Sequence, residues 1–291
     1  DITDAVSQTY GDNGVYLVTL RAEDDDGGVT VETFTVTVNN VVPTVPALED
    51  RTLFEGDALD LSLDIDDPGS DDILVVWSFG YSGFTDEVRL YLNDPSVGVD
   101  PYPSPEYNPR HIIDSIHQVY GDNGVFNVSV TVMDDDGAVV SDSFVLTVLN
   151  VLPDFELPSE LDLNEGDYLN LTLDISDPGS DDIRVTVDWD YAGFDNFEAL
   201  YLNNASIGAD PYPSPEYNPR SIEQFVSRQY GDNGLFNVTV TVTDDDGGVV
   251  TKVLQLTVHN VAPLLSDVDD GAGGSEPGDD VTVSGSLTVR I

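Results

Sequence analysis

The sequence predicts an all-β protein built from tandem β-sandwich repeats with a period of 110 residues. One stretch occurs three times: a tyrosine, a Gly-Asp-Asn-Gly turn, an alternating strand and an Asp-Asp-Asp-Gly run, beginning at Tyr10, Tyr120 and Tyr230. Apolar and polar residues alternate after each turn, which is typical of half-buried strands. Each acidic run closed by glycine predicts a tight hairpin, because glycine tolerates the positive φ of such turns. A strict internal period sets the number of domains better than chain length does.

Residues 1–42 correspond to the C-terminal half of one unit. Strands are expected over 15–22 and 30–38, joined by a hairpin at 24–28. In the second strand threonines alternate with apolar residues, as expected where one face is buried. Pro43 then ends a short linker and keeps it extended.

Two complete units follow at 43–152 and 153–262, and they align without a gap. Each contains a Glu-Gly-Asp turn, an alternating strand, an acidic loop and a core strand with one tryptophan. Trp77 and Trp189 lie two positions apart in the alignment, hence on the same face, and we expect both in the core. Residues 263–291 are expected to be the N-terminal part of a further repeat. The inward residues of the alternating strands are Leu59, Leu61, Leu63 and Ile65 in one unit and Leu169, Leu171, Leu173 and Ile175 in the other.

Each complete unit carries a proline- and tyrosine-rich excursion, identical in letters at 100–110 and 210–220. Its four prolines exclude a helix or a central strand and favour a stiff loop with polyproline II segments. Tyrosines on such a loop offer faces that stack on sugar rings or pack on a neighbouring chain. A rigid cover over the sandwich edge is the plainer interpretation, and the sequence leaves these alternatives open.

The composition is strongly acidic, with 56 acidic against 9 basic side chains and a formal net charge of -47. Nucleic acid is therefore excluded as a class of partner, because phosphate binding requires a basic surface. Like charges on a compact chain repel and destabilise the fold, which implies bound divalent cations or concentrated salt. Adaptation to concentrated salt explains scattered surface acids, but not their recurrence at the same turns in each copy.

Together these motifs resemble the PKD (polycystic kidney disease) repeat, an immunoglobulin-like β-sandwich. The matching marks are the Glu-Gly-Asp turn, the Asp-Pro-Gly loop, the aromatic strand at 77–80, the Tyr-Gly-x-x-Gly approach at 120–124 and the Asp-x-Asp-Gly end at 134–137. The set covers nearly the whole chain. It departs from the family in the Trp-Asp-Phe-Gly-Asp-Gly run, which is Trp-Ser-Phe-Gly-Tyr-Ser-Gly at 77–83, and in the extra excursion. The resemblance implies tandem immunoglobulin-like (PKD-like) sandwiches of an extracellular or surface protein.

In an immunoglobulin-type sandwich, the second-to-third and sixth-to-seventh strand loops lie where the chain enters, and the first-to-second and fifth-to-sixth connections lie where it leaves. This order brings the acidic loops of one unit against the exit turns of the unit before it, across the short linker at 150–153. Like charges about 4 Å apart repel by ~4 kcal/mol at an effective dielectric near 20, so a cation is expected between them.

We therefore predict Ca²⁺ as the cofactor, bound at each junction and within the acidic loops. Calcium accepts carboxylate, amide and carbonyl oxygens, whereas magnesium prefers fewer protein ligands and zinc requires His or Cys. The alternative is that the acidic runs are ordinary hairpin turns of an acid-rich protein. The predicted ligands are Glu55, Asp57, Asp67, Asp71, Asp72, Asp122, Asn123, Asp134, Asp135, Asp136, Asn150, Glu165, Asp167, Asp177, Asp181, Asp182, Asp232, Asn233, Asp244, Asp245 and Asp246.

The chain is not expected to be an enzyme. His111, His117 and His259 have no nucleophile or acid partner in the sequence pattern, and we expect them on the surface. A phosphate-binding loop, a Gly-x-Ser-x-Gly elbow and a zinc motif are all missing. There is no cysteine, and no stretch approaches the ~20 apolar residues of a membrane span, so no membrane insertion is expected in this segment.

Four Asn-x-Ser/Thr sequons are candidate glycosylation sites. They lie at Asn127, Asn170, Asn204 and Asn237, and all but Asn204 fall on the expected outward faces of strands. Chance is the alternative, because Asn and Thr are common on solvent-facing strand positions.

These observations predict an extracellular, calcium-stabilised structural or adhesive repeat protein: a spacer, or the subunit of a surface layer or filament. Its expected partners are other copies of itself, as in a homopolymer, or surface proteins or polysaccharide. The alternative is a carbohydrate-binding accessory region of a secreted polysaccharide-degrading or proteolytic enzyme, acting through the tyrosine-rich excursions.

Overall fold

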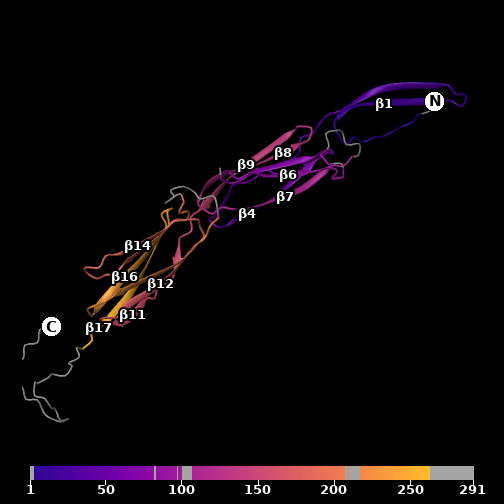
Figure 1. Cartoon of the computed structure of the whole chain (residues 1–291). Coiled ribbons are helices and arrows are strands. Elements are labelled where there is room, and N and C mark those ends of the chain that lie inside the picture. The colour runs from indigo at the N-terminus through magenta and orange to yellow at the C-terminus, as the bar shows by residue number, and fades with distance from the viewer. Residues whose placement is uncertain are drawn as a thin grey trace, which may run out of the picture.

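The structure is a computed structural model in which every regular element of the described residues is a β-strand. An N-terminal hairpin and two complete modules follow one another end to end (Figure 1). None of the described residues forms a helix able to cross a membrane. The fragment expected at 263–291 lies outside the described residues, which are 3–81, 83–96, 98–99, 107–206, 209 and 217–262.

The N-terminal hairpin consists of β1 (Gly14–Glu23) and β2 (Val29–Val38), which pair antiparallel over their full lengths. Its turn is closed by the Asp24 carboxylate, which accepts a hydrogen bond from the Gly28 amide at 2.6 Å. Gly27 has a φ of 86°, the left-handed conformation that glycine adopts without steric cost. The expected hairpin is therefore confirmed, with both strands slightly longer than the sequence pattern indicates.

The first complete module is a sandwich of two sheets. One sheet pairs β4 with β7 and is widened by an antiparallel bridge between Thr44 and Asp66. The other has the order β3-β9-β8-β5-β6, with β3 parallel to β9. The strands are β3 (Arg51–Phe54), β4 (Ala58–Asp67), β5 (Ile73–Ser78), β6 (Glu87–Tyr91), β7 (Arg110–Val119), β8 (Gly124–Asp134) and β9 (Val139–Leu149).

The second complete module repeats this arrangement. Its sheets have the orders β10-β12-β15 and β11-β17-β16-β13-β14, and β11 is parallel to β17. Two sheets with this strand order define an immunoglobulin-like sandwich, so the predicted fold class is confirmed. The strands are β10 (Asp154–Phe155), β11 (Glu160–Asn164), β12 (Tyr168–Asp177), β13 (Ile183–Asp188), β14 (Phe197–Tyr201), β15 (Arg220–Gln229), β16 (Gly234–Thr243) and β17 (Val249–His259).

Each module has its own core, and the alternating positions predicted to face inward are buried. Trp77 and Trp189 are both buried, as expected. The repeated tyrosine is a core residue as well: Tyr120 donates to the Phe79 carbonyl at 3.0 Å, and Tyr230 donates to the Trp189 carbonyl at 2.8 Å. This bond crosses between the sheets and fixes the Gly-Asp-Asn-Gly turn that follows the tyrosine.

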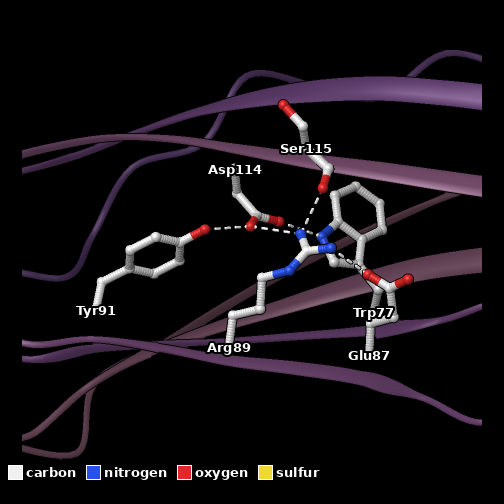
Figure 2. A network of polar contacts seen from close by, with 6 residues as sticks. All are labelled: Trp77, Glu87, Arg89, Tyr91, Asp114 and Ser115. Atoms are coloured by element: carbon white, nitrogen blue, oxygen red, sulfur yellow. Dashed lines mark hydrogen bonds and ion pairs between the residues drawn. The ribbon is translucent and has the colours of Figure 1, made fainter.

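A buried ionic network distinguishes the first complete module from the second (Figure 2). The fully buried Asp114 carboxylate accepts hydrogen bonds from Trp77 Nε1 at 2.7 Å, Arg89 Nη1 at 2.7 Å and Tyr91 Oη at 2.5 Å. Arg89 also pairs with Glu87 and donates to the Ser115 carbonyl. The network joins β7 of one sheet to β5 and β6 of the other. In the second module the positions of Trp77, Arg89 and Asp114 hold Val187, Ala199 and Gln224.

The described ends of the proline-tyrosine excursions are hydrogen-bonded to the acidic loops. In the first complete module the Asn108 amide donates to Ser70 Oγ at 2.8 Å, and its side chain donates to Asn93 Oδ1 at 2.6 Å. Asn218 makes the equivalent bonds in the second module. The described C-terminal part of each excursion therefore lies against the acidic loop of its own module, while 100–106 and 210–216 lie outside the described residues.

Candidate metal centre at the module junctions

The loops of consecutive modules meet as the strand order predicts. We call the contact between the hairpin and the first complete module the first junction, and that between the two complete modules the second junction. At the second, the Ser180 amide donates to the Gly121 carbonyl at 2.6 Å, and the Val151 amide donates to Glu55 Oε1 at 2.6 Å. Asn150 Nδ2 also donates to Asp244 Oδ2 at 3.1 Å. Backbone and side chains of both modules thus hold the junction together.

Carboxylates from both modules converge at the second junction. Glu55 and Asp122 come from exit turns of the first complete module, and Asp181 and Asp246 come from entrance loops of the second. One oxygen from each of the four lies within 4.8 Å of the others. We call this set the outer group.

A second set of carboxylates lies beside it within one module. Asp177, Asp181 and Asp244 each place an oxygen within 4.8 Å of the other two, and all three are buried. We call this set the inner group. Asp181 belongs to both groups, so six carboxylates in total gather at the junction.

The first junction repeats the pattern with equivalent residues. Asp67, Asp71 and Asp134 form its inner group, and Asp12, Asp71 and Asp136 form its outer group. Asp71 takes the shared position that Asp181 has at the second junction. Among the described residues this outer group has three carboxylates.

Several buried oxygens in these groups lack a hydrogen-bond donor. Glu55 Oε2, Asp177 Oδ2 and both oxygens of Asp181 receive no hydrogen bond from any group that the structure describes. The same holds for one oxygen each of Asp67 and Asp71. Burying an ionised carboxylate without a partner is costly, so such a group is normally protonated or binds a cation. The groups contain only aspartate and glutamate and neither histidine nor cysteine. Such a set of carboxylate oxygens fits Ca²⁺, which takes six to eight oxygen ligands.

Without a cation, Glu55 and Asp181 favour the protonated form. Burial, followed by repulsion from Asp177, Asp246 and Asp122, raises the pKa of Glu55 to about 8. Burial and then repulsion from Glu55 and Asp177 raise the pKa of Asp181 to about 10. Carboxyl groups of this kind lose their protons when a divalent cation replaces the neutralising charge.

At the first junction, burial and then repulsion from Asp67 raise the pKa of Asp71 to about 8. The shared aspartate is thus the strongly perturbed group of the acidic loop at both junctions. The repetition indicates that the perturbation comes from the architecture of the junction rather than from one local contact.

Other predicted ligands shape the loops instead of joining the groups. Asp72 Oδ1 accepts from the Asn93 amide at 2.6 Å, and Asp182 Oδ1 accepts from the Asn203 amide at 2.5 Å. Asp135 and Asp245 in turn accept from the amides of Asp72 and Asp182, at 3.2 Å and 3.0 Å. Asn123 is a hydrogen-bond partner of Asp246.

The predicted ligands of the Glu-Gly-Asp turns divide into two kinds. Asp57 and Asp167 are exposed and accept hydrogen bonds from the amides of Phe54 and Asn164, so they cap their own turns outside the carboxylate groups. Glu165, Asp232 and Asn233 lie at the exit of the second complete module, where the described residues form no carboxylate group.

Two functional residues were missed by the sequence analysis. Asp12 of the hairpin joins the outer group of the first junction. Asn40 donates to Asp134 Oδ2 at 2.9 Å, as Asn150 does to Asp244. The signal was available, because Asp12 and Asn40 lie 110 residues before Asp122 and Asn150 in the repeat.

The Glu-Gly turn of one module packs directly on the next module. A Cβ atom at Gly56 would lie 3.0 Å from the Pro178 carbonyl oxygen and 3.5 Å from the Tyr217 ring. The described end of the excursion therefore contacts the preceding module. At the first junction, the equivalent surfaces of Pro68, Gly69 and Tyr107 line a cavity of about 230 Å³.

Gly56→Ala is expected to weaken the second junction, whereas Gly166→Ala provides a matched control. Both glycines have a left-handed φ, 80° and 90°, so both substitutions carry a backbone cost of roughly 1–2 kcal/mol. Only at Gly56 would the added methyl group meet a neighbouring module among the described residues. We expect Gly56→Ala to increase proteolysis at 150–153 and Gly166→Ala to leave it unchanged. Equal cleavage of the two variants would contradict close packing at the second junction.

The remaining predicted sites lie on the surface. Asn127, Asn170, Asn204 and Asn237 are exposed, so the orientation expected for the sequons is observed, and their glycosylation stays a prediction. The three histidines are exposed and pair with aspartates on neighbouring strands: His111 with Asp66, His117 with Asp60 and His259 with Asp162.

Strand order and repeat period define the chain as a tandem array of immunoglobulin-like sandwiches. Neither a protein-family model nor a curated protein matches it. Among solved structures it is similar to a PKD domain of an M14-like peptidase from a Thermoplasmatales archaeon, with 17% identity over 37% of this chain and 93% of that one and a TM-score of 0.25.

Two multi-domain structures are similar over more of the chain. The sialic acid binding region of a Streptococcus sanguinis adhesin is 12% identical over 77% of this chain and 79% of that one, with a TM-score of 0.25. A segment of titin with three immunoglobulin domains is 14% identical over 86% and 76%, with a TM-score of 0.30. The function is therefore inferred from the geometry of the junctions.

Proposed function

We propose that this protein is a rod-like spacer of an extracellular structural or adhesive protein, in which Ca²⁺ bound between consecutive sandwiches holds them in line. One observation carries the proposal. At the second junction, carboxylates of two modules converge, and Glu55 Oε2 and both oxygens of Asp181 are buried with no donor among the described groups. A cation shared by both modules supplies the missing partner.

Electrostatics supports a role for the cation in alignment. Each pair of ionised carboxylates about 4 Å apart repels by roughly 4 kcal/mol at an effective dielectric near 20. Because the outer group draws two carboxylates from each module, docking without a cation requires either that carboxyl groups take up protons or that the modules withstand this repulsion. A bound cation converts it into attraction between the modules. Ordinary acidic hairpin turns do not explain why the shared oxygens are buried and converge across a junction.

An extracellular setting suits a calcium site of this kind. Extracellular calcium modules bind with Kd values of about 10⁻⁴–10⁻³ M, so they remain loaded only where calcium is abundant. A stiff acidic rod then separates or displays whatever it is linked to. The partners we propose are further copies of the chain, as in a homopolymer, or surface proteins or polysaccharide.

Small-angle scattering with and without calcium tests this function. In low salt, removal of calcium is expected to broaden the distribution of interatomic distances and to increase flexibility, because the junctions lose their shared ions. Calcium should restore a narrow, rod-like profile at concentrations at which magnesium does not. A profile that is the same with and without calcium would rule out the spacer mechanism.

Glu55→Gln and Glu165→Gln form a matched pair for the same measurement. Glu55 Oε1 accepts a hydrogen bond from the Val151 amide, and Glu165 Oε1 accepts one from the Val261 amide at 2.8 Å. Glutamine preserves both bonds, but only Glu55 belongs to a carboxylate group of the described residues. We expect Glu55→Gln to require more calcium to become rod-like and Glu165→Gln to behave as the wild type.

A further inference from the structure

We infer that each junction binds two cations that share one aspartate, Asp181 or Asp71, and that the ion held within one module binds before the ion held between modules. This inference deepens the proposed function and rests on it, since it specifies how the calcium site is built and filled. The spacer role itself requires only that some cation be shared across the junction.

The sharing follows from the overlap of the two carboxylate groups. Asp181 places an oxygen within 4.8 Å of Asp177 and Asp244 on one side, and within 4.8 Å of Glu55, Asp122 and Asp246 on the other. Six carboxylates exceed the charge that one divalent ion neutralises. Two ions with a bridging carboxylate between them balance more of this charge and use both sides of Asp181.

The burial of the Asp181 side chain and its lack of hydrogen-bond donors are the independent observation that points to bound ions. Its relative exposure is 1%, and neither of its oxygens receives a hydrogen bond from any described group. Asp177, by contrast, accepts from the Gly179 amide at 2.7 Å and leaves only Oδ2 without a donor. A carboxylate with both oxygens buried and unbonded is what a bridging metal ligand requires.

The order of binding follows from which residues build each group. All members of the inner group belong to the second complete module. Its backbone positions two of them, Asp177 through the Gly179 amide and Asp244 through the Gly248 amide at 2.5 Å, and Asn150 of the linker also donates to Asp244. The inner group therefore needs no carboxylate of the first module. The outer group exists only when Glu55 and Asp122 of the first module approach, and its member Asp246 is exposed. The inner site is therefore preorganised, whereas the outer site is coupled to docking.

The first junction repeats this arrangement with different residues. Asp71 is 2% exposed, its Oδ2 has no donor among the described groups, and it also belongs to two groups.

Counting bound calcium ions by native mass spectrometry tests the inference, with Asp181→Asn, Glu55→Gln and Asp177→Asn in the full chain. At saturating calcium, Asp181→Asn should bind two ions fewer than the wild type, and each of the other two variants one fewer. Glu165→Gln serves as the control and should bind the wild-type number. A loss of only one ion in Asp181→Asn, or loss of the same single ion in Glu55→Gln and Asp177→Asn, overturns the shared-ion arrangement.

Calcium titration tests the order in which the inner and outer ions bind. Glu55→Gln should keep the tight binding phase and lose the weak one. Asp177→Asn should lose the tight phase and also need roughly tenfold or more calcium to fill the outer site, because the ion that positions Asp181 is gone. If Asp177→Asn fills the outer site at the wild-type concentration, sequential binding is wrong. Near-ultraviolet circular dichroism checks folding, and Asp71→Asn provides the same test at the first junction if Asp181→Asn does not fold.

The outcomes separate this inference from the proposed function. One ion per junction together with calcium-dependent stiffening would overturn the shared-ion arrangement and leave the spacer role intact. Two ions per junction with a scattering profile insensitive to calcium would overturn the spacer role and support the arrangement of ions.

Discussion

Protein stripped of divalent cations in low salt is expected to melt at a lower temperature at pH 8 than at pH 5, and millimolar calcium is expected to abolish this loss at pH 8. Calcium at about 10 times its Kd adds about 1.4 kcal/mol per site. For domains of this size, that corresponds to roughly 5–10 °C in the melting temperature. With cations removed, Glu55 and Asp181 favour the protonated form instead.

The direction of this pH dependence follows from the direction of the pKa shifts. Without metal, burial and neighbouring carboxylates raise the pKa of Glu55 to about 8 and that of Asp181 to about 10, above the ordinary values of 4.5 and 3.8. Between the unfolded and folded values, the folded state binds more protons than the unfolded state. The contribution of Glu55 and Asp181 to the stability of the metal-free protein therefore falls as pH rises through this window. It is largest near and below their unfolded pKa values.

Differential scanning calorimetry at pH 5 and pH 8, with calcium and after its removal, measures both effects. Asp181→Asn sharpens the test, because the neutral amide removes a buried charge and a metal ligand together. We expect it to raise the melting temperature of the metal-free protein at pH 8 and to lower that of the calcium-loaded protein. A variant that shifts both in the same direction would show that Asp181 has a packing role and no role in binding.

The fold was predictable because its signals are local and repeated. Alternation over β4 and β12 identifies the buried face directly, since a strand places every second residue on the same side. The Tyr-Gly-Asp-Asn-Gly stretch repeats for a physical reason: Tyr120 and Tyr230 anchor the same turn from inside the core. The loops at each end of a module follow from strand order alone, and so does the meeting of acidic loops with exit turns.

The different roles of neighbouring aspartates in the acidic loops could not be predicted from the sequence. Asp181 and Asp182 are adjacent and chemically identical, yet Asp181 faces both carboxylate groups while Asp182 accepts from the Asn203 amide. The fold of the loop against the excursion decides which of these two aspartates points toward the junction. Neither composition nor residue spacing predicts that fold. The exposed Asp57 was assigned to the site for the same reason, because the sequence does not distinguish a turn cap from a ligand.

Removal of Arg89 is expected to destabilise the first complete module by about 3 kcal/mol, because it leaves the Asp114 carboxylate buried without its counter-ion. Burial alone raises the pKa of Asp114, but hydrogen bonds from Tyr91, Arg89 and Trp77 outweigh it and lower the pKa overall. Asp114 therefore stabilises the module above its unfolded pKa, and this contribution is lost as pH falls toward acid. The cost of Arg89→Ala should accordingly shrink at acid pH below the ordinary carboxyl pKa, as Asp114 takes up a proton.

The double variant Arg89→Ala with Asp114→Gln is expected to be more stable than Arg89→Ala alone. The second module holds alanine and glutamine at these positions, where Tyr201 donates to Gln224 Oε1, so a neutral pair is compatible with the fold. Replacing the buried charge by an amide removes the cost of an unpaired carboxylate and keeps an acceptor for Tyr91 and Trp77.

Denaturant unfolding followed by Trp77 fluorescence measures this comparison. The chain has two tryptophans, so Trp189→Phe isolates the signal of the first module, and phenylalanine is what that module holds at the equivalent position, Phe79. If the double variant is no more stable than Arg89→Ala, then lost packing of the Arg89 side chain, rather than an uncompensated charge on Asp114, explains the loss. In that case Arg89→Met, which restores apolar bulk without charge, should recover the stability that the double variant does not.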